Sequence, residues 1–221
     1  MDATIDRAEL TISSKTYSAW SLRGWLMCRL AGLEVEEKYV ENDAANRAEL
    51  LLLSPSVLVP RLTHNGASIW DTLAIAEYLN EQFPGAGMLP GDPIARAHCR
   101  SISGEIHSGF SNLRSALPMN LKVKHERFPV FSGARPDIER IETIWRDCLT
   151  RYGGPYLFGA APTIADAMYA PVTRRFISYG VAVSEQSRAY CETIAAWEPL
   201  AKWVAAALAE PEEMEELDVE F

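Results

Sequence analysis

Two hydroxyl groups, those of Thr16 and Ser18, lie where the sequence predicts the start of a helix. A leucine recurs every four residues through the stretch 18–31, and Gly32 follows it, as glycine follows many helices. A hydroxyl at the amino end of a helix can donate a hydrogen bond to an anion that the helix dipole also attracts. The simpler interpretation is that Ser18 only caps the helix, and spacing alone favours it.

The first 83 residues alternate strand and helix patterns that would position these hydroxyls. Asp71 is the predicted N-cap of one helix, and Asn65-Gly66 is the predicted turn of a hairpin. The predicted order is β-α-β-α-β-β-α, with strands at 9–13, 37–41, 60–63 and 67–70 and helices at 18–31, 45–53 and 72–82.

The segment 84–90 is rich in proline and glycine and predicts a linker. We therefore expect an α/β domain over 1–83 and an all-helical domain with an acidic tail over 91–221. The expected helices of the second domain are 93–115, 136–152, 163–178, 185–195 and 197–209. Thr163 and Asp166 form a predicted capping box at one helix start, a sign of folding rather than of catalysis.

Common catalytic and cofactor templates are absent from the sequence. The four histidines have no H-E-x-x-H spacing, and the chain has no Walker loop and no G-x-S-x-G motif. No G-x-G-x-x-G motif follows a predicted strand. We therefore expect a protein that works without a bound metal or nucleotide.

The charge pattern argues against a nucleic-acid partner. The 221 residues carry a formal net charge of −9, and seven acids but no base lie among the last twelve residues. Four widely spaced cysteines, no secretory signal and no long apolar run predict a reduced, cytoplasmic protein that does not enter the membrane. We interpret the tail as a mobile, solubilising end.

Four segments, in this order, resemble cytosolic glutathione transferases. They are Thr16 to Arg23, Asn46 to Pro55 with Leu58 to Leu62, Ile69 to Leu79, and Tyr156 to Ala167. The resemblance is to bacterial-type members activated by serine or threonine, with zeta- and tau-like features near the N-terminus. It implies a thioredoxin-like α/β domain followed by an all-α bundle, and glutathione as a co-substrate.

The resemblance assigns the activation of glutathione's thiol to a hydroxyl at the start of the first helix. A free thiol has a pKa of about 8.5, so a hydrogen bond that favours the thiolate promotes attack on an electrophile. The serine of serine-type relatives aligns with Thr16, whereas Ser18 aligns with a nearby position that faces the thiol in some relatives. Both hydroxyls remain candidates, and neither position holds a cysteine.

The resemblance also implies the glutathione-binding residues. The Val59 backbone would pair with the cysteinyl unit beside a cis Pro60, and Asp71-Thr72, in place of the usual Glu-Ser, would hold the γ-glutamyl group. Arg47 matches a basic position that pairs with the glycyl carboxylate in some classes. Leu58 departs from the usual glutamine or lysine.

We expect a pocket for a small hydrophobic electrophile beside this site. Tyr17 would form one wall, and His107, Phe110 and Arg114 would share a face of the helix predicted at 93–115. The alternative is that Phe110 is a core residue and the other two are solvated.

The expected function is conjugation of glutathione to that electrophile by a homodimeric detoxification enzyme. The alternatives are a glutathione-dependent isomerase of the maleylacetoacetate type and a non-catalytic glutathione-transferase-like binding protein. The isomerase class carries a Ser-Ser-Cys pattern that this sequence lacks.

Overall fold

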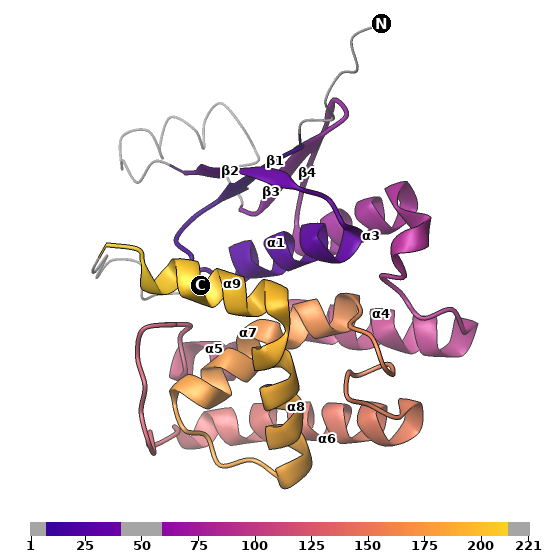
Figure 1. Ribbon diagram of the computed structural model, residues 1–221. Coiled ribbons are helices and arrows are strands. Elements are labelled where there is room, and N and C mark those ends of the chain that lie inside the picture. Colours follow the sequence, from indigo (N-terminus) through magenta and orange to yellow (C-terminus); the bar gives the residue numbers. More distant parts are fainter. Residues whose placement is uncertain (1–7, 41–58, 212–221) are drawn as a thin grey trace, which may run out of the picture.

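A computed structural model describes residues 8–40 and 59–211 (Figure 1). The α/β part consists of β1 (Ala8–Ile12), α1 (Ala19–Ala31), β2 (Val35–Tyr39), β3 (Arg61–His64), β4 (Ala67–Trp70) and α3 (Thr72–Gln82). The helical part consists of α4 (Pro93–Ser108), α5 (Ser111–Ala116), α6 (Arg135–Tyr152), α7 (Ile164–Ser178), α8 (Glu185–Ala196) and α9 (Glu198–Leu208). The helix predicted at 45–53 lies outside the described residues.

The sheet has the strand order β2-β1-β3-β4. β1 pairs with β2 in parallel and with β3 antiparallel, and β3 and β4 form an antiparallel hairpin. The hairpin turn is Asn65-Gly66, and both residues have positive φ, as the sequence predicts. This mixed sheet, followed by a helical bundle, confirms the predicted glutathione-transferase fold.

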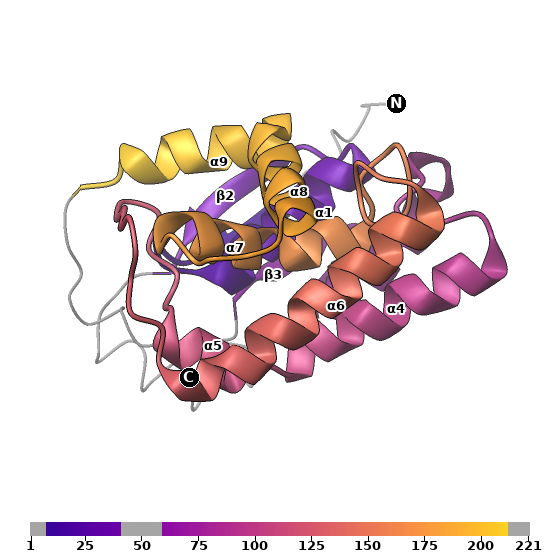
Figure 2. The same cartoon turned by 90° about the horizontal axis from the view of Figure 1, so that it is seen from below.

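Helix α1 lies between the sheet and the helical part (Figure 1). Its residues Leu22, Leu26 and Met27 are fully buried, because α1 packs against α3 on one side and against α7 and α9 on another. Figure 2 shows α7 deep in the helical part, where it contacts α1, α4 and α8. The core therefore runs continuously from β1 to α9, and the start of α1 lies where the two parts meet.

The capping box predicted at the start of α7 is present. The Asp166 carboxylate accepts hydrogen bonds from the Thr163 backbone N–H (2.7 Å), the Thr163 hydroxyl (2.9 Å), the Leu157 N–H (3.0 Å) and the Tyr190 hydroxyl (3.1 Å). Asp166 is fully buried, so these donors replace the water that its carboxylate would otherwise bind.

Replacing Thr163 with alanine is expected to lower the free energy of unfolding by about 1–2 kcal/mol, because a helix cap is lost. Urea denaturation measures this change. Thr193→Ala is the matched control, since Thr193 is half-buried on α8 and its hydroxyl donates to the Ala189 carbonyl of its own helix (3.1 Å). Equal losses in the two variants would contradict the capping role.

The prediction of one continuous helix over 93–115 is wrong. The helix breaks at Gly109 and Phe110, where Phe110 has φ of +63°, so α4 ends at Ser108 and α5 begins at Ser111. Arg114 stabilises the break by donating from Nη2 to the carbonyls of Ile106 (2.6 Å) and His107 (3.1 Å) at the end of α4. The spacing of the residues does not predict this break, because Gly109 alone interrupts the helical pattern there.

Every helix within residues 8–40 and 59–211 is too short or too polar to span a lipid bilayer.

Candidate functional site

Ser18 is the N-cap of α1. Its Oγ accepts a hydrogen bond from the Ser21 N–H (3.1 Å) and donates one to the Ser21 Oγ (2.9 Å), which also accepts from the Ser13 N–H (3.1 Å). A hydroxyl hydrogen rotates freely between acceptors. The Ser18 hydrogen can therefore turn from the Ser21 Oγ to a ligand atom at the amino end of α1, while a lone pair of the Ser18 Oγ keeps the cap to the Ser21 N–H. Ser18 can thus cap the helix and donate to an anion at the same time.

Thr16 has a different environment. It is 1% exposed, and its hydroxyl donates within the protein, to the Glu210 carboxylate (2.8 Å) or the Ala207 carbonyl (3.2 Å). A hydroxyl carries only one hydrogen. The Thr16 hydroxyl therefore faces α9, whereas that of the half-buried Ser18 lies at the helix start.

The peptide bond between Val59 and Pro60 is cis, as the resemblance implies. Pro60 packs directly on α1 at Gly24, where an added Cβ would lie only 2.5 Å from the Pro60 Cγ. Any side chain at position 24 would push Pro60 away. Because Gly24 has no side chain, the Val59 backbone can lie close to α1, the helix that Ser18 caps.

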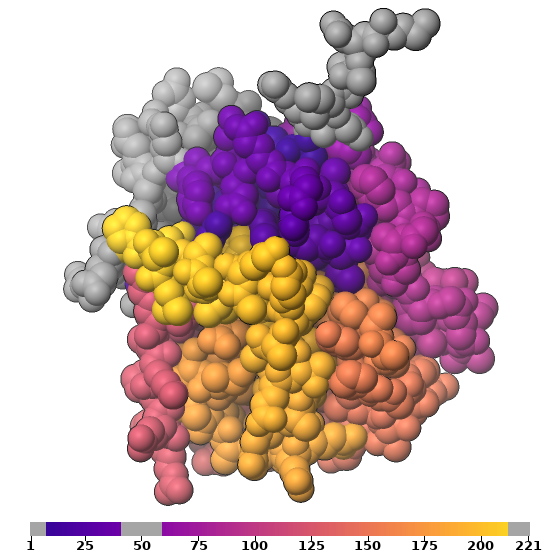
Figure 3. All heavy atoms as spheres, viewed as in Figure 1, coloured from indigo at the N-terminus to yellow at the C-terminus, as the bar shows by residue number. Residues whose placement is uncertain are grey.

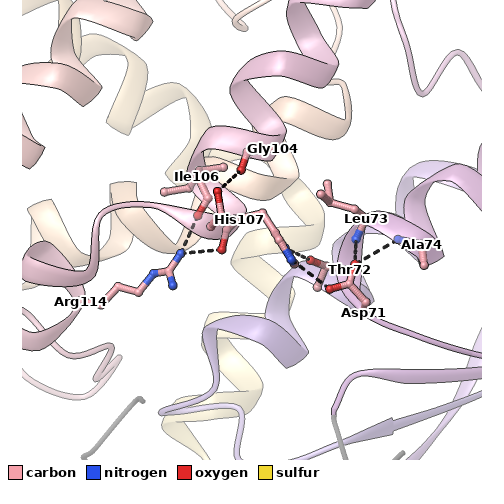
Figure 4. Close-up of polar contacts among 9 residues, drawn as sticks. Asp71, Thr72, Leu73, Ala74, Gly104, Ile106, His107 and Arg114 are labelled. Carbon is pink, nitrogen blue, oxygen red and sulfur yellow. Dashed lines mark hydrogen bonds and ion pairs between the residues drawn. The ribbon is translucent and has the colours of Figure 1, made fainter.

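Asp71 and Thr72 form the second helix start of the site (Figure 4). Asp71 caps α3, as predicted, because its Oδ1 accepts from the N–H groups of Leu73 (2.8 Å) and Ala74 (3.2 Å). Its Oδ2 lies 3.1 Å from the His107 Nε2, and the Thr72 hydroxyl lies 3.4 Å from the His107 Nδ1. His107 on α4 therefore covers the amino end of α3.

Trp20 links the two helix starts and is a residue that the sequence analysis did not assign to the site. Its ring lies edge-on to His107, with centroids 5.2 Å apart. The guanidinium groups of Arg23 and Arg114 lie 4.5 Å and 5.1 Å from the Trp20 ring centroid. Its place in the first turn of α1, two residues after Ser18, was the available signal.

The prediction that His107, Phe110 and Arg114 share one helix face is wrong, because the helix ends between them. His107 turns toward Asp71 and Thr72, while Arg114 reaches back to the end of α4 (Figure 4). Phe110 is partly buried against the core, and Tyr17 is half-buried in the loop before α1. His107 and Arg114 both lie against the Trp20 ring, but they come from two helices, α4 and α5, and not from one helix face as predicted.

Arg47 and Leu58 lie outside the described residues. Within the ranges 8–40 and 59–211, no group of three or more histidine, cysteine, aspartate or glutamate side chains could hold a metal ion.

All four cysteines are buried. Burial raises the pKa of Cys99 to about 11 and that of Cys28, Cys148 and Cys191 to about 12. These groups are therefore thiols at neutral pH, and none lies at the start of α1.

We expect iodoacetamide to leave all four cysteines of the native protein unmodified at neutral pH, because the thiolate is the reactive form. Intact-mass spectrometry after alkylation measures this. The same reaction in concentrated urea is the control and is expected to label every cysteine. Rapid labelling of the native protein would contradict the buried, protonated state of the thiols.

Comparison with known proteins gives matches to both parts of the chain. Residues 17–82 match the family described as "Glutathione S-transferase, N-terminal domain", and residues 123–206 match "Glutathione S-transferase, C-terminal domain". A probable maleylacetoacetate isomerase of Caenorhabditis elegans is 32% identical over 162 residues, which cover 71% of this chain and 75% of that protein.

Solved structures share the fold. A glutathione transferase homologue from Burkholderia with bound glutathione has a TM-score of 0.68 at 23% identity and covers 93% of this chain and 99% of its own. A maleylacetoacetate isomerase from Anaeromyxobacter dehalogenans with bound glutathione has a TM-score of 0.61 at 25% identity, with 90% and 96% coverage.

Proposed function

Since this chain belongs to the glutathione S-transferase family, we propose that it joins the thiol of reduced glutathione to a small apolar electrophile. The observation that carries this proposal is that two helix starts are linked through one pair of rings. Ser18 begins α1, Asp71-Thr72 begins α3, and Trp20 and His107 connect them. Each helix start favours an anion, and glutathione offers a thiolate and carboxylates.

Ser18 is the proposed activator of the thiol. Its hydroxyl donates to the glutathione sulfur, which favours loss of the thiol proton to solvent. The thiolate electron pair then forms the sulfur–carbon bond, and the electrophile either loses a leaving group or takes up a proton. Thr16 is the weaker candidate, because it is 1% exposed and its hydroxyl donates to the Glu210 carboxylate or the Ala207 carbonyl, away from the start of α1.

The proposed glutathione site runs from Val59 to Thr72. The Val59 backbone pairs with the cysteinyl unit, the Asp71 carboxylate attracts the γ-glutamyl amine, and the Thr72 hydroxyl binds the γ-glutamyl carboxylate. Thr72 is 1% exposed, and its neighbour His107 lies at the long end of hydrogen-bonding distance. The ligand carboxylate must therefore displace the His107 ring from the Thr72 hydroxyl. Arg47 remains the proposed partner of the glycyl carboxylate.

The proposed electrophile pocket lies beside the thiol and is lined by Tyr17, Phe110 and Arg114, with His107 at its border with the glutathione site. Arg114 is held at the end of α4, over the Trp20 ring, so its charge has a fixed place. A flat aromatic electrophile with an anionic or strongly polar substituent suits this combination, because its ring can stack on the aromatic side chains and its substituent can accept hydrogen bonds from the guanidinium.

Calorimetry with glutathione, followed by an absorbance assay with an aryl halide, tests the proposed function. Heat of binding and consumption of one glutathione per product are expected. Absence of heat at millimolar glutathione would exclude a transferase and an isomerase alike. Heat without turnover of any substrate would instead support a non-catalytic binding protein.

A glutathione-dependent isomerase of the maleylacetoacetate type is the second candidate, favoured by the 32% identity with the Caenorhabditis elegans protein. Turnover of maleylacetoacetate with a catalytic amount of glutathione distinguishes the two. An isomerase regenerates glutathione in each cycle, whereas a transferase stops when glutathione is consumed.

We also propose a cytoplasmic homodimer with a role in detoxification, as is usual for the family. Light scattering after size-exclusion chromatography would then give twice the chain mass of 24.6 kDa.

A further inference from the structure

The end of α9 contacts the loop between β1 and α1 (Figures 1 and 3). The Trp203 Nε1 donates to the Lys15 carbonyl (3.0 Å), and the Ala207 carbonyl lies 3.2 Å from the Thr16 hydroxyl. These contacts bring Glu210 next to the loop that leads into Ser18.

The Glu210 carboxylate accepts hydrogen bonds from four donors of this loop. Its Oε1 accepts from the Lys15 N–H (2.7 Å), and its Oε2 accepts from the Thr16 N–H (2.9 Å), the Thr16 hydroxyl (2.8 Å) and the Ser14 hydroxyl (3.0 Å). Hydrogen bonds to an ionised acceptor are stronger than neutral ones. Both oxygens are used, so an uncharged isostere cannot replace the carboxylate.

The backbone of Glu210 is held separately. The Lys122 Nζ donates to the Glu210 carbonyl (2.7 Å) and lies 3.4 Å from the Pro211 carbonyl. Glu210 is therefore fixed at both its main chain and its side chain, and α9 does not simply fray into solvent after Leu208.

The loop transmits this contact to Ser18 through Ser14. The Ser14 hydroxyl donates to Glu210, and the Ser14 carbonyl accepts a hydrogen bond from the Ser18 N–H (3.1 Å). Thr16 lies between Ser14 and Ser18 in the sequence, and its carbonyl accepts a hydrogen bond from the Leu121 N–H (3.2 Å). The direction of the Ser18 side chain thus depends on the loop 14–17, and the polar groups of residues 14–16 in this loop bind the Glu210 carboxylate.

We propose, on the basis of the function inferred above, that Glu210 is a positioning residue for Ser18. Its carboxylate fixes the loop 14–17 and thereby holds the Ser18 hydroxyl in the direction that stabilises the glutathione thiolate. Glu210 does not touch the substrate. The first acid of the C-terminal acidic run is accordingly part of the site architecture rather than of a free tail.

Glu210→Gln tests this proposal in the full-length protein. The amide turns an NH₂ group toward the loop donors, so at least one N–H or O–H loses its acceptor. The variant is expected to lower kcat about 10-fold with an unchanged Kd for glutathione. The apparent pKa of the bound thiol, measured from the ultraviolet absorbance of the thiolate, is expected to rise. Glu210→Asp keeps two acceptor oxygens and should restore part of the loss.

The matched control is Glu198→Gln, at the opposite end of α9 from Glu210. Glu198 is exposed and pairs with Lys202 one turn away, so the kinetics and thiol titration of Glu198→Gln should equal those of the wild type. Lys122→Met is a second test that leaves the carboxylate in place and removes the anchor of its main chain. It should change kcat in the same direction by a smaller factor.

Amide hydrogen exchange provides a measurement that does not depend on glutathione. The Lys15 and Thr16 amides should exchange faster in Glu210→Gln than in the wild type or in Glu198→Gln. If the wild type forms the thiolate and Glu210→Gln matches its kcat and thiol titration, the positioning role is overturned and the proposed function stands. If the wild type neither binds glutathione nor forms the thiolate, both are overturned.

Discussion

Replacing Ser18 with alanine is expected to lower kcat about 10²–10³-fold, the usual loss when one donor to a developing or stabilised anion is removed. Glutathione should still bind, because the proposed contacts of Val59, Asp71 and Thr72 do not involve Ser18. Steady-state kinetics with isothermal calorimetry separates the two quantities. The apparent pKa of the bound thiol should rise toward its value in free glutathione.

Two further variants separate activation from helix capping, since Ser18→Ala also removes the N-cap of α1. Ser18→Asp keeps a good N-cap but places a negative charge against the thiolate, so it should fold normally and lack turnover. Ser18→Thr keeps both the cap and the donor and should retain most of the activity. A large loss of kcat in Thr16→Ala together with full activity in Ser18→Ala would instead assign activation to Thr16.

Replacing Thr72 with valine is expected to raise the Kd for glutathione about 10–100-fold, the effect of losing a hydrogen bond of roughly 1.5–3 kcal/mol to a charged group. Valine has nearly the same shape, and the backbone N–H of residue 72 remains. The effect should therefore appear in binding rather than in folding. Calorimetry with glutathione, together with urea denaturation of the same samples, measures both.

The matched control for Thr72→Val is Thr143→Val. Thr143 is exposed on α6, and its hydroxyl donates to the Glu139 carbonyl of its own helix (2.8 Å). It should leave the Kd unchanged. A Kd for Thr72→Val equal to that of the control would show that the γ-glutamyl carboxylate binds elsewhere.

Much of the fold follows from local sequence patterns. Gly32 ends α1 with a φ of +75°, Asn65-Gly66 turns the hairpin, and Asp71 and Thr163 mark helix starts. Each of these residues acts on its immediate neighbours, so its effect is visible in a short window of sequence. The family resemblance added the cis bond at Pro60, which no local pattern predicts.

The contacts that complete the candidate site are long-range, and the sequence could not show them. His107, in the last turn of α4, meets Asp71 at the start of α3. Trp20 acquires its place through His107 and Arg114, neither of which is its sequence neighbour. Side chains that are distant in the sequence meet only when the helices pack together. The spacing of residues along the chain does not predict how the helices pack.

The contact between Glu210 and the loop before α1 also has a consequence for biosynthesis. The two partners are 194–196 residues apart in the sequence. During translation, the α/β part can form its sheet from residues already made, but the loop that leads into Ser18 must wait for Glu210. The proposed activating hydroxyl is thus ordered only after α9 has been made, and a nascent chain with a folded sheet would still lack the geometry proposed to stabilise the thiolate.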